Sequence, residues 1–492
     1  MAVISPTTIN DLPIEIIEPP ISDQDCNDED EENDDEASVQ EGSEDGDYER
    51  DVDADIEGSD AGSEDEDSIG EDLRDPASFP ISVACVCLRW WSILKGFPKF
   101  WTRIAIDIGH QSFTRMLDTL SFSGTLPLCL LVFHRQETTL DADTEKRRME
   151  AVMERLAQRP KRCFYLNFDI RFSKSLPHLS TVMALISPKV NTVKLISRED
   201  NCRNDVSPHP PVASPSNGFP NLKTLSLTVT MFMSMYRLSP EWWKALDGEE
   251  FLHLTISSYS FGADGTDIDV FDFLSAIVVT GGIAELELSH LSLASPQEAD
   301  KDKYSGKDRD LDVSSLSLTK LSGYLVSTLF DFLSITTDST TITSCNLKGT
   351  FKRFLFLFNL ILVDMPVTTD IRPLLFHWGG RCLSVRNCSS FDDGLLEFLS
   401  KDVVWGHNSQ DGGSKPEFAA FDATEFNIRD CENFTFRALK GMVKGRNKAA
   451  PSLNFLRRVE EVTVCGRAPT ITAEEVQWFE SNLRVALFPV AI

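Results

Sequence analysis

The residues of this 492-residue chain with the widest chemical scope are its 11 cysteines and 8 histidines. An odd number of scattered cysteines is not a disulfide framework in a chain of this length, so reduced thiols are expected. Cys85 and Cys87 stand two apart, whereas Cys382, Cys388 and Cys431 have no Cys-x-x-Cys or His-x-x-x-His partner. We therefore expect these cysteines to be small hydrophobic residues, with no bound metal and no cofactor.

The sequence also lacks the common catalytic motifs. No Gly-rich loop opens a helix after a strand, and neither Gly-x-Ser-x-Gly nor His-Glu-x-x-His occurs. A basic stripe of the kind that binds nucleic acid is absent as well. These observations predict a protein that is not an enzyme and does not bind nucleic acid.

Two short segments near the N-terminus have the pattern of amphipathic helices. Apolar residues at 83, 86, 90, 93 and 94 fall on one helical face; Pro98 then stops the helix, and Trp101 follows as a buried anchor. In the earlier segment, 10–17, Asn10 or Asp11 can cap a helix that begins with Leu12 and Pro13. The two segments predict parts of one small helical bundle.

These segments resemble the two halves of an F-box, with Leu12-Pro13 matching its usual opening. The second half matches at Val86, Cys87, Arg89, Trp90, Pro98 and Trp101 and departs at Leu88 and Phe100. The resemblance implies a domain that binds the Skp-type adaptor of a cullin ubiquitin ligase and performs no chemistry. By this resemblance, the F-box core and adaptor surface comprise Leu12, Pro13, Ile16, Ile17, Val86, Trp90, Ile93, Pro98 and Trp101.

An acidic tract, residues 23–75, separates the two halves. It contains 27 Asp and Glu but only Arg50 and Arg74 as basic residues, so it accounts for most of the net charge of −30. Such a composition cannot bury enough apolar surface to fold, and we expect disorder. A solvated spacer, a site for basic partners and a phosphorylation platform are the open interpretations. The candidate phosphorylation sites, each with an acidic residue two or three positions later, are Ser43, Ser63 and Ser68.

Beyond residue 105, short apolar strand motifs recur with irregular spacing and alternate with helical patterns. Clear copies lie near 222–227, 283–293, 313–321 and 459–464, with looser copies between them. Units of about 30 residues that cannot bury their own apolar face usually stack on one another. The predicted fold class is therefore α/β, an irregular leucine-rich-repeat-like solenoid, or horseshoe, preceded by a small helical F-box that a disordered acidic insert interrupts.

The predicted organisation is a first F-box part at 8–22, the acidic insert at 23–75, a second F-box part at 76–108 and the solenoid at 109–492. Its predicted function is substrate recognition in a Skp-cullin-F-box ubiquitin ligase, with an unknown protein substrate. The longest apolar run, 354–363, is too short to span a bilayer, and no signal peptide is apparent. We therefore expect no membrane association and a cytoplasmic or nuclear location.

Two alternatives stay open. In the first, the chain is an acidic scaffold whose decayed F-box does not bind the adaptor. In the second, the F-box residues only pack a helical cap on the end of the solenoid. Four aromatic residues that could be binding anchors, Trp242, Trp243, Phe376 and Trp378, are expected in the core.

Overall fold

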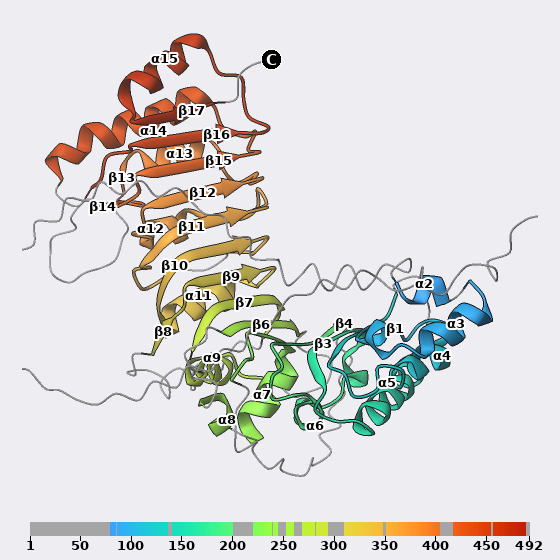
Figure 1. The fold of residues 1–492 in the computed structure, drawn as a ribbon. Coiled ribbons are helices and arrows are strands. Elements are labelled where there is room, and N and C mark those ends of the chain that lie inside the picture. Colours follow the sequence, from blue (N-terminus) through green and yellow to red (C-terminus); the bar gives the residue numbers. More distant parts are fainter. Residues whose placement is uncertain are drawn as a thin grey trace, which may run out of the picture.

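A computed structural model describes residues 79–84, 86–135, 140–199, 220–238, 240–244, 252–259, 268–280, 282–293, 309–347, 351–403, 417–453 and 456–488 (Figure 1). Their main feature is one open 15-stranded sheet in the order β1-β2-β3-β4-β5-β6-β7-β9-β10-β11-β12-β15-β16-β17, with β8 beside β10. Its strand pairs are parallel.

The strands are short in the C-terminal part of the sheet and reach ten residues in β3 and β10. A separate antiparallel pair is formed by β13 and β14. The bounds are β1 (Arg103–Asp107), β2 (Leu128–Phe133), β3 (Cys163–Phe172), β4 (Thr192–Glu199), β5 (Thr224–Thr228), β6 (Leu252–Tyr259), β7 (Ile283–Leu291), β8 (Asp310–Asp312), β9 (Ser315–Thr319), β10 (Ser334–Thr343), β11 (Leu357–Val363), β12 (Cys382–Arg386), β13 (Asp402–Val403), β14 (Glu417–Phe418), β15 (Glu425–Arg429), β16 (Glu461–Cys465) and β17 (Val485–Leu487).

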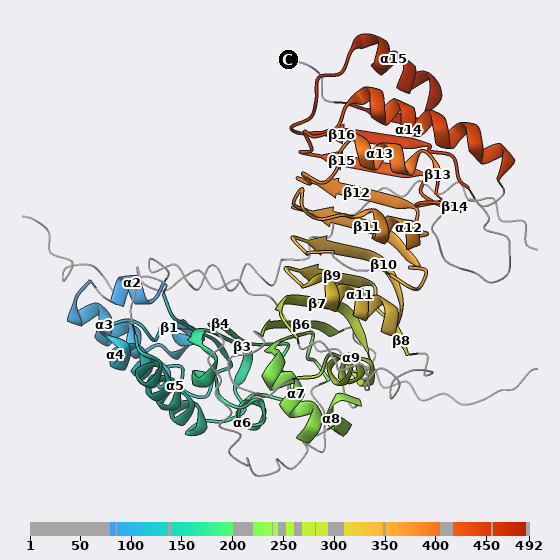
Figure 2. The same ribbon diagram turned by 180° about the vertical axis from the view of Figure 1, so that it is seen from behind.

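Helices connect most consecutive strands, because two neighbouring parallel strands need a crossover connection between them. Figure 2 shows α11 to α14 in front of the upper strands, whose other side faces the viewer in Figure 1. The bounds are α2 (Ile81–Ala84), α3 (Leu88–Lys95), η3 (Pro98–Trp101), α4 (Phe113–Thr119), α5 (Ala142–Ala157), η4 (Ser173–Ser175), α6 (Leu179–Leu185), α7 (Val229–Leu238), α8 (Pro240–Lys244), α9 (Val270–Val279), α11 (Gly323–Phe332), α12 (Arg372–His377), α13 (Asp393–Leu399), α14 (Phe436–Ala449), η5 (Ala450–Ser452) and α15 (Ala473–Asn482).

The core lies between the sheet and these helices. In β9, Leu316 and Leu318 are buried and alternate with partly exposed serines and a threonine, so one face of the strand is apolar. The parallel register places Leu316 beside Leu286 of β7 and Thr340 of β10. One continuous cluster of buried apolar side chains extends from the N-terminal helices to Phe479 of α15.

The structure contradicts the predicted leucine-rich-repeat horseshoe behind a small helical F-box. α2 and α3 are four and eight residues long, and the chain leaves them through η3 directly into β1, which pairs with β2. The protein has one open parallel α/β sheet. The strands of this sheet have three to ten residues and its helices up to 16, so the units are too unequal even for an irregular leucine-rich-repeat solenoid.

Individual strand predictions fared better. The clear motif copies lie on β5, β7, β9 and β16, and looser copies lie on strands such as β2, β3 and β15, so these elements are confirmed. Trp242, Trp243, Phe376 and Trp378 are all at most 5% exposed and belong to the core as expected. Among the described helices, none has both the length and the apolar character needed to cross a bilayer.

Candidate functional site

Aromatic rings anchor the helical segment that precedes β1. Trp101 in η3 is 1% exposed, and its Nε1 donates a 2.8 Å hydrogen bond to the carbonyl oxygen of Leu94. The centre of its ring lies 6.0 Å from that of Trp91 and 5.1 Å from that of Phe122. Both pairs are edge-on, which is a favourable arrangement of aromatic rings. The predicted turn at Pro98, which begins η3, and the predicted burial of Trp101 are confirmed.

The predicted continuous helix from residue 83 to residue 94 is wrong. α2 ends at Ala84 and α3 begins at Leu88, which leaves Val86 outside both helices and 55% exposed. Trp91 and Leu94, three residues apart, form the side of α3 that faces the core. Because Val86 lies outside α3, the half-buried Trp90 of α3 does not share a buried helical face with it.

Large apolar side chains are exposed around this anchored segment. Leu88 is 84% exposed, Val86 55%, Phe79 51% and Phe97 39%. The rings of Phe79 and Phe97 lie 5.0 and 5.7 Å from Phe100, so at least these two are neighbours. All four residues belong to one short segment, 79–97, that includes α2 and α3, and exposed apolar groups close together are typical of a binding surface. We call Phe79, Val86, Leu88 and Phe97 the N-terminal apolar surface.

The other predicted site residues divide into two groups. Ile93 is half-buried in α3, and Pro98 is exposed at the start of η3. The rest lie outside the described residues, namely Leu12, Pro13, Ile16 and Ile17 of the first F-box part and the serines Ser43, Ser63 and Ser68.

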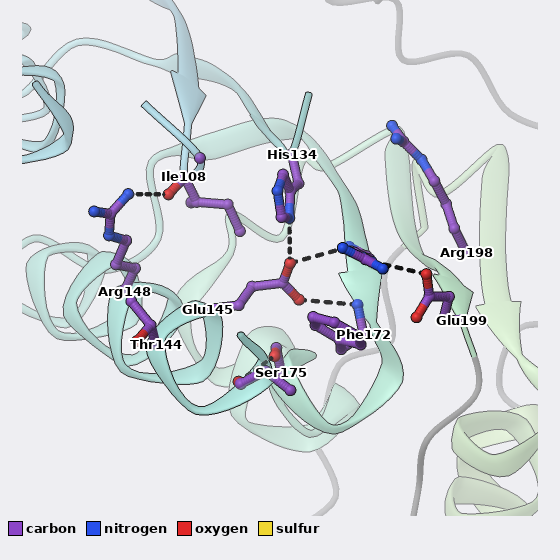
Figure 3. A network of polar contacts seen from close by, with 12 residues as sticks. Ile108, His134, Thr144, Glu145, Arg148, Phe172, Ser175, Arg198 and Glu199 are labelled. Atoms are coloured by element: carbon purple, nitrogen blue, oxygen red, sulfur yellow. Dashed lines mark hydrogen bonds and ion pairs between the residues drawn. The ribbon is translucent and has the colours of Figure 1, made fainter. Parts of the chain in front are cut away.

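A buried polar network lies at the carboxyl ends of β2 and β3 (Figure 3). His134, which follows β2, and Glu145 on α5 are 1% and 0% exposed, and Nδ1 of His134 lies 2.5 Å from Oε2 of Glu145. The other carboxylate oxygen of Glu145 accepts a 2.9 Å hydrogen bond from the backbone N–H of Phe172. The N–H of Arg171 also donates to this carboxylate at 3.3 Å.

A carboxylate next to an imidazole is the arrangement that orients a catalytic histidine. Here the carboxylate is occupied by backbone donors of β3, and neither side chain of the pair reaches solvent. The network therefore attaches α5 to the ends of the strands. The sequence carried one signal for it, because Glu145 stands in line with Met149 and Val152 on the buried face of α5.

Ion pairs occupy the same edge of the sheet on either side of this network. Asp107 at the end of β1 pairs with Arg135 at 3.2 Å. The guanidinium of Arg198 in β4 donates two hydrogen bonds of 3.2 Å to the carboxylate of Asp169 in β3. Ligands of open parallel sheets usually bind at this edge, but its carboxylates are used here in contacts within the protein.

The buried cysteines serve packing. Three of them follow the strands β10, β12 and β15, namely Cys345, Cys388 and Cys431. Sγ of Cys388 donates to the carbonyl oxygen of Leu362 at 3.3 Å and accepts from the N–H of Met365 at 3.4 Å. Burial raises the pKa of Cys388 to about 12 and that of Cys345 to about 11, so both thiols stay protonated at neutral pH. Cys388 and Cys431 are buried as expected, whereas Cys382 is half-buried.

A second group of exposed aromatic residues lies at the amino end of β11. Phe354, Phe356 and Phe358 are 46%, 72% and 53% exposed and alternate with the buried Leu355 and Leu357. A cavity of about 280 Å³ adjoins them, with Phe330, Leu333, Ile335 and Arg353 in its lining. We call Phe354, Phe356 and Phe358 the aromatic strip.

Neither a metal site among the described residues nor a match to a known protein adds to these two surfaces. Within the described ranges, no three His, Cys, Asp or Glu side chains are grouped so that they could hold a metal ion. A comparison with models of known protein families finds no matching family, and a search of curated proteins finds no match. The resemblance to an F-box therefore depends on the sequence motifs alone.

Proposed function

We propose that the protein is a non-catalytic substrate-recognition subunit of a Skp-cullin-F-box type ubiquitin ligase. The segment 79–101 would bind the Skp-type adaptor, and the large parallel sheet would hold an unidentified protein target. The F-box-like motifs suggest the adaptor, and the N-terminal apolar surface is the structural observation that carries the proposal.

Two properties of this surface support protein binding. Leu88 and Val86 are mostly exposed, so contact with a partner would remove them from water. The same short segment is held in place by the buried Trp101, which donates a hydrogen bond to the carbonyl oxygen of Leu94. Binding would therefore require little additional ordering of the segment. Exposed apolar side chains that lie near one another are a feature of protein interaction sites.

Target binding is assigned to the aromatic strip. Its three phenylalanines project from one strand end beside the cavity lined by Phe330 and Ile335, which could receive an apolar side chain. The aromatic strip lies at β11 in the interior of the strand order, whereas the N-terminal apolar surface precedes β1 at one end of the sheet (Figure 1). An adaptor and a target could therefore bind at the same time.

Titration of the full chain with purified Skp-type adaptor tests the proposal. Leu88→Asp adds a charge to the proposed interface without touching the core, and we expect at least tenfold weaker binding, about 1.4 kcal/mol or more. Leu238→Asp is the matched control, since Leu238 is 47% exposed at the end of α7. Equal binding by the two variants, or none by the unmodified chain, would rule out this adaptor surface.

An acidic scaffold with a decayed F-box is the second proposal. The interruption between α2 and α3 favours it, because the helix expected to carry the second F-box motif is split there. In that case the adaptor would not bind even though the N-terminal apolar surface is present. The same titration decides between the two proposals.

A further inference from the structure

The charge of the chain changes sign where the described structure begins. Residues 1–78 contain 30 acidic and 2 basic residues, whereas residues 79–199 contain 18 basic and 10 acidic residues. No Asp or Glu occurs from 76 to 106. A strongly negative segment is thus joined directly to a positive part of the fold.

Part of the negative charge of residues 79–199 is buried. Asp107, Glu145 and Asp169 are 2%, 0% and 8% exposed and are used in the polar contacts at the ends of β1 to β4. Because Asp107 and Asp169 are paired with Arg135 and Arg198, each of these pairs is neutral, and the excess of 18 basic over 10 acidic residues is carried by other side chains.

Several of these cations surround one turn, residues 120–124, after α4. Nζ of Lys95 lies 5.1 Å from the centre of the Phe122 ring. Arg159 donates hydrogen bonds of 3.1 and 2.8 Å to the carbonyl oxygens of Ser121 and Gly124. Pro98 lies next to Gly124, which brings η3 and its Lys99 to the same place. We call four exposed side chains on the segments that meet at this turn the basic surface, namely Lys95, Lys99, Arg159 and Lys161.

The carboxylates near this turn do not neutralise it. Asp118 is paired with Arg155 at 3.1 Å, and Glu154 is the other acidic residue on the adjoining end of α5. Arg162 adds a further positive charge and donates to the carbonyl oxygen of Leu120 at 2.6 Å. Cations therefore outnumber carboxylates here.

The acidic tract ends close to the basic surface. Phe79 packs edge-on against Phe100 at 5.0 Å, and Phe100 follows Lys99 directly. Asp75 precedes Phe79 by four residues, a span of at most about 14 Å. The tract is thus tethered to the fold beside the cations, which gives it a high effective concentration there.

We propose that the acidic tract, residues 23–75, binds the basic surface of its own chain. Opposite charge provides the attraction, and the tether at Phe79 favours this segment over a free acidic partner. Contacts of this type weaken as salt screens them. Because Phe97 lies between Lys95 and Lys99 in the sequence, the bound tract would also cover part of the N-terminal apolar surface. The contact itself does not depend on the proposed adaptor.

The test uses a fluorescein-labelled peptide of residues 23–50 and two forms of the full chain. In one form, the Asp and Glu residues of 23–75 are replaced by Asn and Gln, which should leave the basic surface unoccupied. We expect the peptide to bind this neutralised form at least tenfold more tightly than the unmodified chain, and to dissociate at about 0.5 M salt.

Surface variants locate the contact. Lys95→Gln, Lys99→Gln and Lys161→Gln together in the neutralised form should weaken peptide binding at least tenfold. Lys146→Gln, Lys352→Gln and Lys444→Gln together, at exposed positions elsewhere, should change it less than twofold. All six side chains are exposed, so the fold should be kept, and circular dichroism verifies this.

Three results would overturn the proposal. Equally tight binding to the unmodified chain would show that the basic surface is open to another acidic partner. Equal losses in the two triple variants would place the contact elsewhere, and a neutralised form that does not bind the peptide would leave the tract as a solvated spacer.

Discussion

At the scale of single residues, Glu145 shows how much a buried carboxylate depends on its partners. It is fully buried, next to His134 and the backbone N–H groups of the last two residues of β3. Glu145→Ala removes an acceptor from all of these donors, and the loss of a buried charged partner typically costs about 3 kcal/mol. A urea titration followed by circular dichroism should show this as a lower midpoint.

Glu150→Ala provides the control for that experiment, because Glu150 is exposed on the same helix. Its effect should stay within about 0.5 kcal/mol. If both variants unfolded at the same urea concentration, the network in Figure 3 would contribute nothing specific to stability.

The thiols supply a prediction about pH. Burial raises the pKa of Cys163 and Cys388 to about 12, so the reactive thiolate is scarce until the pH approaches that value. A brief treatment of the native protein with N-ethylmaleimide should label Cys465, which is exposed, and leave Cys163 and Cys388 unmodified from pH 7 to pH 9. Mass spectrometry of the peptides measures this, and early labelling of Cys388 would contradict its burial.

At the scale of elements, the connection from α12 to β12 requires a glycine. Trp378 donates from Nε1 to the carbonyl oxygen of Leu357 at 2.7 Å, and a Cβ on Gly380 would collide with both of these atoms. Gly380→Ala should therefore destabilise the protein by about 2 kcal/mol or more. Thermal unfolding measures the change.

Gly441→Ala is the opposite case. Gly441 lies within α14, and nothing within 4 Å would meet an added Cβ. Alanine favours the helix, so this variant should gain about 0.5 to 1 kcal/mol. An unchanged or higher melting temperature for Gly380→Ala would show that the connection can rearrange.

Elements with apolar periodicity could be predicted from the sequence, and elements without it could not. Leu225 with Leu227 and Val462 with Val464 indicated β5 and β16 because alternate residues of each strand face the core. β10, with the sequence Ser-Ile-Thr-Thr-Asp-Ser-Thr-Thr-Ile-Thr, gave no such signal, since its polar residues are held by pairing with β9 and β11.

The candidate site was predictable to a similar degree. Trp101 was identified as an anchor because Pro98 forces the turn before it. The exposure of Leu88 and the burial of Glu145 depend on which neighbours the chain brings together, and a local pattern does not contain that information.

At the scale of the whole molecule, sheet order follows chain order almost throughout. The same alternation of strand and helix is compatible with uniform short repeats and with one open α/β sheet, which is why the predicted fold class was wrong. The lengths of the elements and the pairing of β1 with β2 distinguish the two arrangements.

Because neighbouring strands of the sheet are also neighbours in the chain, we expect a core mutation to destabilise the nearby strands more than distant ones. Phe426 in β15 is 1% exposed, and Phe426→Ala should cost about 3 to 5 kcal/mol. In the described sheet β15 pairs with β12 and β16. Hydrogen exchange should therefore accelerate in β12, β15, β16 and β17, while β1 to β4 stay protected. Phe168→Ala in β3 should produce the reverse pattern, and uniform acceleration in both variants would indicate a single cooperative unit.

We propose that residues 79–101 form the adaptor-binding surface of a non-catalytic receptor. The most direct test is hydrogen exchange of the full chain with and without saturating Skp-type adaptor. We expect slower exchange in peptides that cover Val86 to Trp101 and unchanged exchange in β15 to β17. Unchanged exchange at 79–101, or protection confined to another part of the sheet, would contradict this proposal.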